Sequence, residues 1–296
     1  MAEQSAIAWT RSTFNPWIGC TKVGPGCDHC YAEQLDKARF SVAVTGGTPE
    51  HPIIHWGKGA PRYRTTAGNW RKVITWNTKA AAGDKPWRVF CASLGDVFDN
   101  EVPSEWRRDL FDLIEATPNL SWLLVTKRIG NVFRMVPHSW VKQFPAQVRL
   151  LITVCNQEEA DRDVNKLLAL PCKNGISYEP ALGPVKWSRW LRKRSMDPRG
   201  SYPVPYLQWI IVGGESTQGA GEARNFNIEW ARKTLVECRA AGVPAFVKQL
   251  GSAAIEQGEF VDGVGNPSYV ALDLRDRAGA DPAEWPEDLR VQEFPT

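Results

Sequence analysis

The sequence lacks several features that would assign it to a familiar class. Its 296 residues contain no apolar run near the ~18 residues that a membrane-spanning helix needs, so we expect no membrane partner. The first residues show no basic stretch followed by an apolar one, which argues against a secretory signal and favours a cytoplasmic protein. The seven cysteines are too few and too irregular for a disulfide framework, and a reducing compartment would leave them available for metal.

The sequence also lacks a large excess of one charge, because the net charge is only +3, and this by itself indicates no nucleic-acid partner. Tryptophan is abundant, with 14 residues, and one segment combines it with four cations. Two interpretations are open. In the first, the indoles stack on bases and the cations bind phosphates; in the second, the segment is a helix that buries its tryptophans and leaves its cations in water. The candidate substrate-binding residues there are Trp187, Arg189, Trp190 and Arg192, followed by Lys193 and Arg194.

Three cysteines, Cys20, Cys27 and Cys30, lie within eleven residues, and no fourth cysteine is near them in sequence. A structural zinc site normally has four protein ligands, and here no second cysteine pair exists. Three thiolates hold three irons of a [4Fe-4S] cluster and leave the fourth iron open for a small molecule such as S-adenosylmethionine. The pattern favours this cluster, with a zinc or redox module and simple buried thiols as the alternatives.

Short apolar runs alternate with helical segments along most of the chain. This alternation predicts an α/β fold with mostly parallel strands in an incomplete (βα) barrel. We expect this barrel over residues 1–251 with an insertion at 41–87, and a C-terminal extension over 252–296 packed on it. The predicted strands are 13–18, 88–93, 121–126, 148–154, 175–178, 208–213 and 245–249, and the predicted helices are near 32–40, 104–116, 129–136, 157–169 and 227–241.

Polar residues follow five successive predicted strands. The carboxyl ends of parallel strands meet at one edge of a sheet, where such folds bind their ligands. We therefore predict a cofactor site there from Ser93, Asp96, Thr126, Lys127, Glu179 and Glu215, with Arg128 beside them. Two cysteines near strand ends, Cys91 and Cys155, are candidate hydrogen-atom donors or else packed thiols.

The segments Asn15-Pro-Trp-Ile-Gly-Cys20 and Cys27-Asp-His-Cys30-Tyr-Ala32 resemble the signature of radical S-adenosylmethionine enzymes related to spore photoproduct lyase. Those enzymes usually space their ligands C-x3-C-x2-C, whereas six residues separate the first two cysteines here. The whole chain resembles more closely a phage-associated family of uncharacterised proteins. The blocks that carry this second likeness are 89–96, 124–128, 177–184, 211–216 and 246–249.

The resemblance implies a barrel of the radical S-adenosylmethionine type with a [4Fe-4S] cluster on Cys20, Cys27 and Cys30. It also implies S-adenosylmethionine as cofactor, an electron donor as partner and a 5′-deoxyadenosyl radical as the reactive species. Residues 93–96 occupy the place of the motif that holds the methionine amino group, although the usual G-G-E is absent. Kinship suggests a nucleobase or nucleotide-linked substrate in DNA. The alternative is a non-catalytic zinc or iron-sulfur protein that binds nucleic acid.

Overall fold

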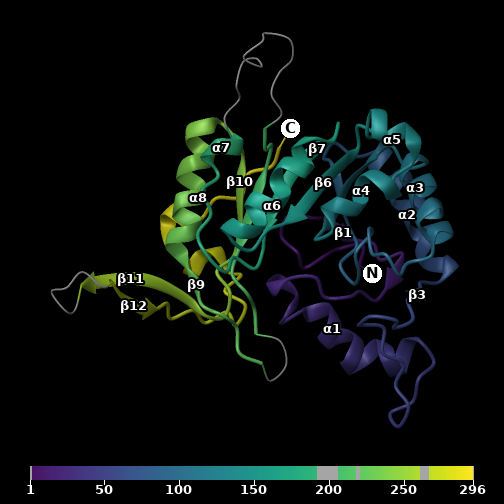
Figure 1. Cartoon of the computed structure of the whole chain (residues 1–296), viewed down its shortest axis with the longest axis horizontal. Helices are drawn as coiled ribbons and strands as arrows, with labels where there is room; N and C mark the ends of the chain where they lie inside the picture. Colours follow the sequence, from purple (N-terminus) through teal and green to yellow (C-terminus); the bar gives the residue numbers. More distant parts are fainter. Residues whose placement is uncertain (1, 192–205, 218–220, 261–266, 296) are drawn as a thin grey trace. The chain divides into compact units, whose positions relative to one another are not determined.

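The computed structural model describes residues 2–191, 206–217, 221–260 and 267–295, and Figure 1 shows its secondary structure. The chain forms two compact units. The first comprises residues 1–152 and 170–173, and the second comprises 153–169 and 174–296. No helix in these described ranges is long and apolar enough to cross a membrane.

The strands of a seven-stranded sheet follow the order β1-β4-β5-β6-β7-β8-β10. In the first unit parallel pairing joins β1 to β4, β4 to β5 and β5 to β6, and in the second it joins β7 to β8 and β8 to β10. The predicted α/β class and the open, mostly parallel sheet are confirmed. The strands are β1 Ser12–Thr13, β4 Trp87–Cys91, β5 Leu120–Thr126, β6 Val148–Thr153, β7 Lys173–Tyr178, β8 Ile210–Gly213 and β10 Ala245–Gln249.

Burial explains why these segments form strands. Every residue of β6 and β8 is buried, as expected for parallel strands covered on both faces. Helix α3 buries Leu110, Phe111 and Ile114. The helices of the first unit are η1 Pro25–Cys27, α1 Tyr31–Leu35, η2 Asp36–Val44, α2 Ala67–Ala81, α3 Ser104–Glu115, α4 Ile129–Met135 and α5 His138–Lys142.

Two predictions for the first unit differ from the structure. The strand expected over 13–18 is divided into β1 and β2 Trp17–Ile18, and β2 pairs with β3 Tyr63–Arg64 in a separate antiparallel ladder. Pro16 has no N–H for a ladder, which separates the two strands at this point. Helix α2 lies within residues 41–87, where we predicted no element. Only Val73 and Trp76 of its fifteen residues are buried, so its apolar pattern is too sparse to indicate a helix.

The second unit contains two capped helices that agree with the predicted positions. The side chain of Asn156 accepts a hydrogen bond from the Glu159 N–H at the start of α6 Gln157–Leu168. Helix α8 Ile228–Ala241 starts at Asn227 in the same way and ends at Gly242, whose φ of +67° suits glycine. The other elements are α7 Ser188–Leu191, β9 Phe226–Asn227, β11 Ala254–Phe260, β12 Pro267–Ala271, η3 Pro282–Glu284 and η4 Glu287–Leu289.

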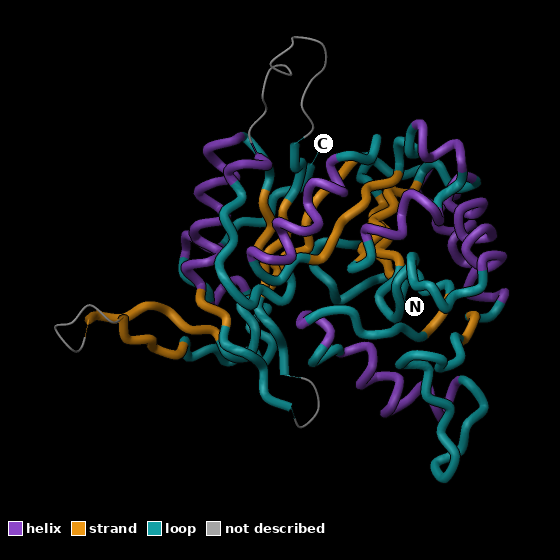
Figure 2. Tube along the Cα trace, viewed as in Figure 1, coloured by secondary structure: helices purple, strands orange, loops and turns teal. Residues whose placement is uncertain are grey.

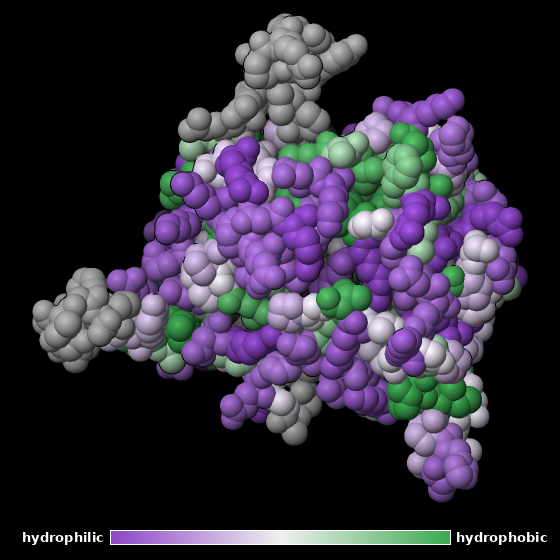
Figure 3. Space-filling view, viewed as in Figure 1, coloured by the Kyte–Doolittle hydropathy of each residue, from purple (hydrophilic) through white to green (hydrophobic). Residues whose placement is uncertain are grey.

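The end of the chain packs within the second unit. Strands β11 and β12 form an antiparallel hairpin, drawn in orange in Figure 2, and β9 pairs with β11 in parallel. Farther along, Gln292 pairs with Phe246 of β10 in an antiparallel bridge. On the face in Figure 3, polar side chains dominate and apolar surface occurs in separate patches.

Candidate functional site

The three clustered cysteines lie on a loop of the first unit that runs from β2 to α1. Cys20 and Cys30 both pack against one hydrophobic cluster, formed by Ile18, Ala32, Trp56 and Leu94. Cys27 ends η1, and Cys30 is the residue before α1. None of the three is in a disulfide, and each is partly exposed.

The three thiols are not gathered around one point. In the part of the chain that the structure describes, no group of three or more His, Cys, Asp or Glu side chains is placed to hold a metal ion. The donor set nevertheless fits an iron-sulfur cluster, because it offers three partly exposed thiols, two of which share an apolar wall. Binding would require the loop between Cys20 and Cys27 to bring its thiols together.

The backbone at Gly19 fixes the start of the cysteine loop. Gly19 has a φ of +116°, and a Cβ there would lie 2.6 Å from the carbonyl oxygen of His55, so no other residue fits without strain. Parallel bridges pair Gly19 with Gly95 and Cys20 with Trp56. The Tyr31 hydroxyl, at the other end of the loop, donates to the Ser93 carbonyl over 2.6 Å. The loop is thereby held against the residues that follow β4.

Buried polar contacts that the sequence did not predict support this loop. The Arg62 side chain is almost fully buried and donates to the Asp99 carboxylate over 2.8 Å, to the Thr21 hydroxyl over 2.7 Å and to backbone carbonyls. Asp36 accepts from both the backbone N–H and the Nδ1 of His55, each at 2.8 Å. Neither Arg62 nor Asp36 lies at a predicted strand end, so no sequence signal identified them.

Three predicted site residues of the first unit, Asp96, Thr126 and Lys127, lie together, and Ser93 precedes Asp96 by three residues. The Asp96 carboxylate is buried and accepts hydrogen bonds from the Thr126 hydroxyl at 2.8 Å and from the Lys127 backbone N–H at 3.1 Å. It also accepts from the N–H of Phe98 and from Arg128. Ser93 lies beside Asn15, whose Nδ2 donates to the Ser93 hydroxyl over 2.9 Å. Asp96 therefore joins the ends of β4 and β5, and four donors occupy its carboxylate.

Arg128 connects this carboxylate to the cysteine loop. Its Nη1 donates to Cys20 Sγ over 3.3 Å and to Asp96 over 3.1 Å. Burial, followed by the Asp96 carboxylate, raises the pKa of the Cys20 thiol to about 12, and Arg128 opposes this rise. Burial alone would lower the pKa of Arg128, but Asp96 and then Cys20 outweigh it and raise that pKa, so the guanidinium stays charged.

The predicted site residues of the second unit form two ion pairs. Glu179 lies after β7, and its Oε1 is 2.9 Å from Lys248 Nζ without hydrogen-bond geometry, while Oε2 accepts from the Ser177 hydroxyl. Glu215 is buried and accepts from the Nε and the backbone N–H of Arg224, each at 3.0 Å. Both carboxylates thus follow strands of the sheet, as predicted, and each has a cationic partner.

The tryptophans expected to stack on bases are buried. Trp187 is fully buried and donates its indole N–H to Thr234, and Trp190 is 4% exposed and donates to Asn165. Arg189 lies over the Trp190 ring at 3.9 Å and pairs with Asp161. These contacts correct the expectation of exposed stacking faces, because both rings belong to the core of the second unit. The predicted Arg192, like Lys193 and Arg194, lies outside the described residues.

The two candidate hydrogen-atom donors are also buried. Cys91 is fully buried at the end of β4, and burial raises the pKa of its thiol far above the ordinary value. Cys155 is likewise inaccessible, and its backbone N–H donates to Glu159. Their surroundings agree with packed thiols, and the role of hydrogen donor stays a prediction.

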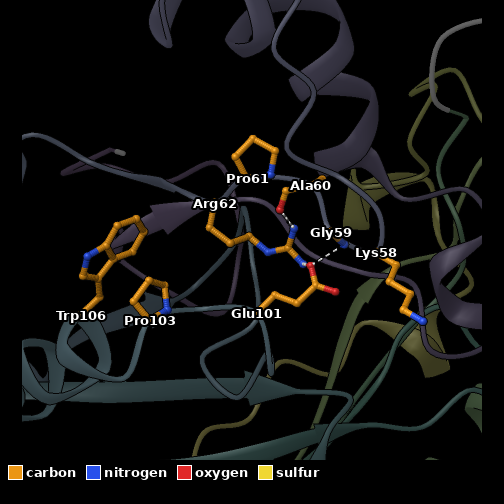
Figure 4. A pocket seen from close by; sticks show the side chains of 8 residues that line it. All are labelled: Lys58, Gly59, Ala60, Pro61, Arg62, Glu101, Pro103 and Trp106. Atoms are coloured by element: carbon orange, nitrogen blue, oxygen red, sulfur yellow. Dashed lines mark hydrogen bonds and ion pairs between the residues drawn. The ribbon is translucent and has the colours of Figure 1, made fainter.

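A surface pocket of about 500 Å³ lies in the first unit. Figure 4 shows Trp106 and Pro103 on one side of Arg62, with Lys58 extending away from the other lining residues. Glu101 accepts from the Gly59 N–H and pairs with Arg62 at 3.1 Å. None of the residues predicted for the cofactor site lines this pocket.

A family model described as Protein of unknown function (DUF5131) matches residues 4–279. The chain belongs to this family. No curated protein and no solved structure matches the chain. The matched range contains the cysteine loop and all the predicted site residues, and the family's description assigns no reaction.

The cysteine loop has a pH-sensitive ion pair that is open to test. Glu33 of α1 contacts Lys22 of the loop at 3.0 Å and Lys37 at 2.8 Å. Burial alone would raise the pKa of Glu33, but hydrogen bonds from Lys37 and Lys22 outweigh it and lower that pKa. Because the pKa of Glu33 is lower in the folded chain than its value of about 4.3 in the unfolded chain, the ionised carboxylate stabilises the fold above about pH 4.3. This stabilisation disappears as the pH falls through the pKa of the folded chain.

We expect Glu33→Gln to lower the free energy of unfolding by about 1 kcal/mol at pH 7, because both lysines are half exposed and solvent screens them. At pH 3 the difference from the parent chain should shrink towards zero. Urea unfolding at both pH values measures it. Glu287→Gln, in η4 of the second unit, is the control, and an equal loss at both pH values would contradict the ion-pair interpretation.

Proposed function

We propose that this protein binds a [4Fe-4S] cluster through Cys20, Cys27 and Cys30 and acts as a radical S-adenosylmethionine enzyme. One observation carries the proposal. The loop with the three thiols is attached to the carboxyl ends of two parallel strands, through Tyr31 to Ser93 after β4 and through Arg128 after β5 to Cys20. Ligand sites of α/β folds lie at this edge of the sheet.

When bound, such a cluster supplies an electron to the sulfonium of S-adenosylmethionine, whose cleavage yields a 5′-deoxyadenosyl radical. The chain's own residues hold and shield the site. The three thiolates would be the iron ligands, and the apolar cluster around Trp56 and Leu94 would limit the access of water to Cys20 and Cys30. Asp96 keeps the ends of β4 and β5 together and orients Arg128.

We assign the binding of S-adenosylmethionine to fewer residues than the sequence analysis predicted. Because four donors already occupy the Asp96 carboxylate, we assign it to positioning, not to direct contact with the cofactor. Ser93, which lies at the end of β4 next to the cysteine loop, is the better candidate for such contact. An electron donor and a reducing cytoplasm are parts of the same proposal, since the cluster must be reduced and protected from oxygen.

The substrate stays a prediction from the family resemblance. A nucleobase or nucleotide-linked substrate was expected to stack on Trp187 and Trp190, and their burial removes that support. The pocket of the first unit that Trp106 lines has a partly exposed indole on which a base could stack, but no predicted site residue lines it.

Anaerobic reconstitution with ferrous iron and sulfide tests the proposal. We expect about four irons per chain, a brown protein, and slow release of 5′-deoxyadenosine when dithionite and S-adenosylmethionine are added. Iron analysis, the visible spectrum and chromatography of the nucleoside measure these results. A colourless protein with about one zinc per chain would instead support the non-catalytic zinc alternative.

A further inference from the structure

Arg128 contacts the sulfur of Cys20, and the proposed function gives this contact no chemical task of its own. We infer that Arg128 is a positioning residue that donates a hydrogen bond to the iron ligand Cys20 and thereby raises the reduction potential of the cluster. The inference rests on the proposed function, since it concerns the cluster that Cys20 would hold. It assigns to one side chain the task of making the centre easier to reduce.

The geometry of the guanidinium supports this role. Nη1 lies 3.3 Å from Cys20 Sγ, and Nη2 donates to the carbonyl of Thr21 at 2.5 Å, so both nitrogens contact the start of the cysteine loop. The side chain is 7% exposed, which leaves little water to compete for these contacts. A hydrogen bond to a sulfur ligand withdraws electron density from the cluster and stabilises the reduced, more negative state.

Two carboxylates keep the guanidinium in place. Asp96 accepts from Nη1 at 3.1 Å, and Asp99 lies 3.7 Å from Nη2. Asp99 is shared with Arg62, whose own Nη2 donates to the Thr21 hydroxyl. Two arginines and two aspartates therefore balance one another beside Cys20, and of these arginines it is Arg128 that contacts the sulfur.

A lysine cannot reproduce this arrangement. Arg128 uses two nitrogens at once, with Nη1 shared between Cys20 and Asp96 and Nη2 on Thr21, whereas a lysine has one compact ammonium on a flexible stem. Arg128→Lys therefore keeps the positive charge and loses the fixed contact with sulfur. Its effect on the cluster separates the hydrogen bond from the charge.

The experiment is a redox titration of the reconstituted protein with dithionite, in which the cluster takes up one electron and electron paramagnetic resonance follows its reduced form. For Arg128→Lys we expect the one-electron reduction equilibrium to become about tenfold less favourable, which corresponds to a midpoint about 59 mV lower. Arg134→Lys is the matched control, because Arg134 lies exposed on α4, contacts Asn131 and should leave the midpoint unchanged.

A second variant guards against a folding defect in the first. Arg128→Met combined with Asp96→Asn removes both charges of the pair, so the net charge near the cluster is unchanged and no carboxylate is left buried without its cation. The midpoint should fall here too, because the sulfur has again lost its donor. Thermal unfolding and the iron-to-protein ratio are recorded for every variant.

The outcomes separate the inference from the proposed function. A parent chain that takes up no iron overturns the proposed function. A parent chain that carries the cluster, with parental midpoints in both Arg128 variants at full iron loading, overturns only the inference, and so does a midpoint that rises. Loss of iron from both folded variants overturns it too, because Arg128 would then be needed to hold the cluster and not to tune its potential.

Discussion

Cys27→Ala should abolish the iron-sulfur centre, leaving less than about one-tenth of the iron that the parent chain takes up on anaerobic reconstitution. The physical reason is that each thiolate holds one iron, and no fourth cysteine lies near the loop to replace it. Cys20→Ala and Cys30→Ala should have the same effect. Iron per chain and absorbance in the visible range measure it.

The matched controls are two cysteines outside the loop. Cys172 is partly exposed and Cys238 is buried. Neither lies in the loop between β2 and α1, and neither packs against the apolar cluster that Cys20 and Cys30 share. Cys172→Ala and Cys238→Ala should therefore keep full iron loading. Full loading of Cys27→Ala would be incompatible with the proposed ligand set.

Asp96→Ala is expected to lower the free energy of unfolding by about 3–5 kcal/mol, because it leaves the buried Arg128 guanidinium without its carboxylate. The substitution also leaves the Thr126 hydroxyl and the backbone N–H groups of Phe98 and Lys127 without their acceptor. Urea unfolding of the metal-free chain measures the loss. Iron uptake should fall with it, because the ends of β4 and β5 lose their connection.

The control for this substitution is an exposed aspartate. Asp109 pairs with Arg64 at 2.6 Å, but its side chain is 48% exposed. Exposed ion pairs contribute little, so Asp109→Ala should cost about 0–1 kcal/mol. A loss for Asp96→Ala no larger than that of the control would mean that the Asp96 group contributes little to the fold.

The sequence was sufficient to predict the strands of the main sheet from β4 onward. Apolar runs such as residues 148–154 have no other stable place than a covered parallel strand, and the turns between them follow from polar residues and helix caps. It also identified Asp96, Thr126 and Lys127 as neighbours, because the ends of parallel strands share one edge of a sheet.

Local sequence was not sufficient to predict elements and burial that depend on contacts between residues far apart in the chain. Helix α2 buries only Val73 and Trp76, so its amphipathic signal is weak, and it forms where those two side chains find a core. The Trp187 indole donates to Thr234, 47 residues further along the chain, and that distant contact turns an apparent stacking face into a core residue.

The spacing of the three cysteines, the strand ends and the α/β class were thus determined by the sequence alone, because they depend on residue type, spacing and periodicity. Only the tertiary structure decided that Asp96 is occupied by four donors and that Arg128 contacts Cys20, 108 residues earlier in the chain. The reason is physical. A hydrogen bond or ion pair in the interior depends on which side chains the fold brings within about 3 Å, and neither composition nor spacing contains that information.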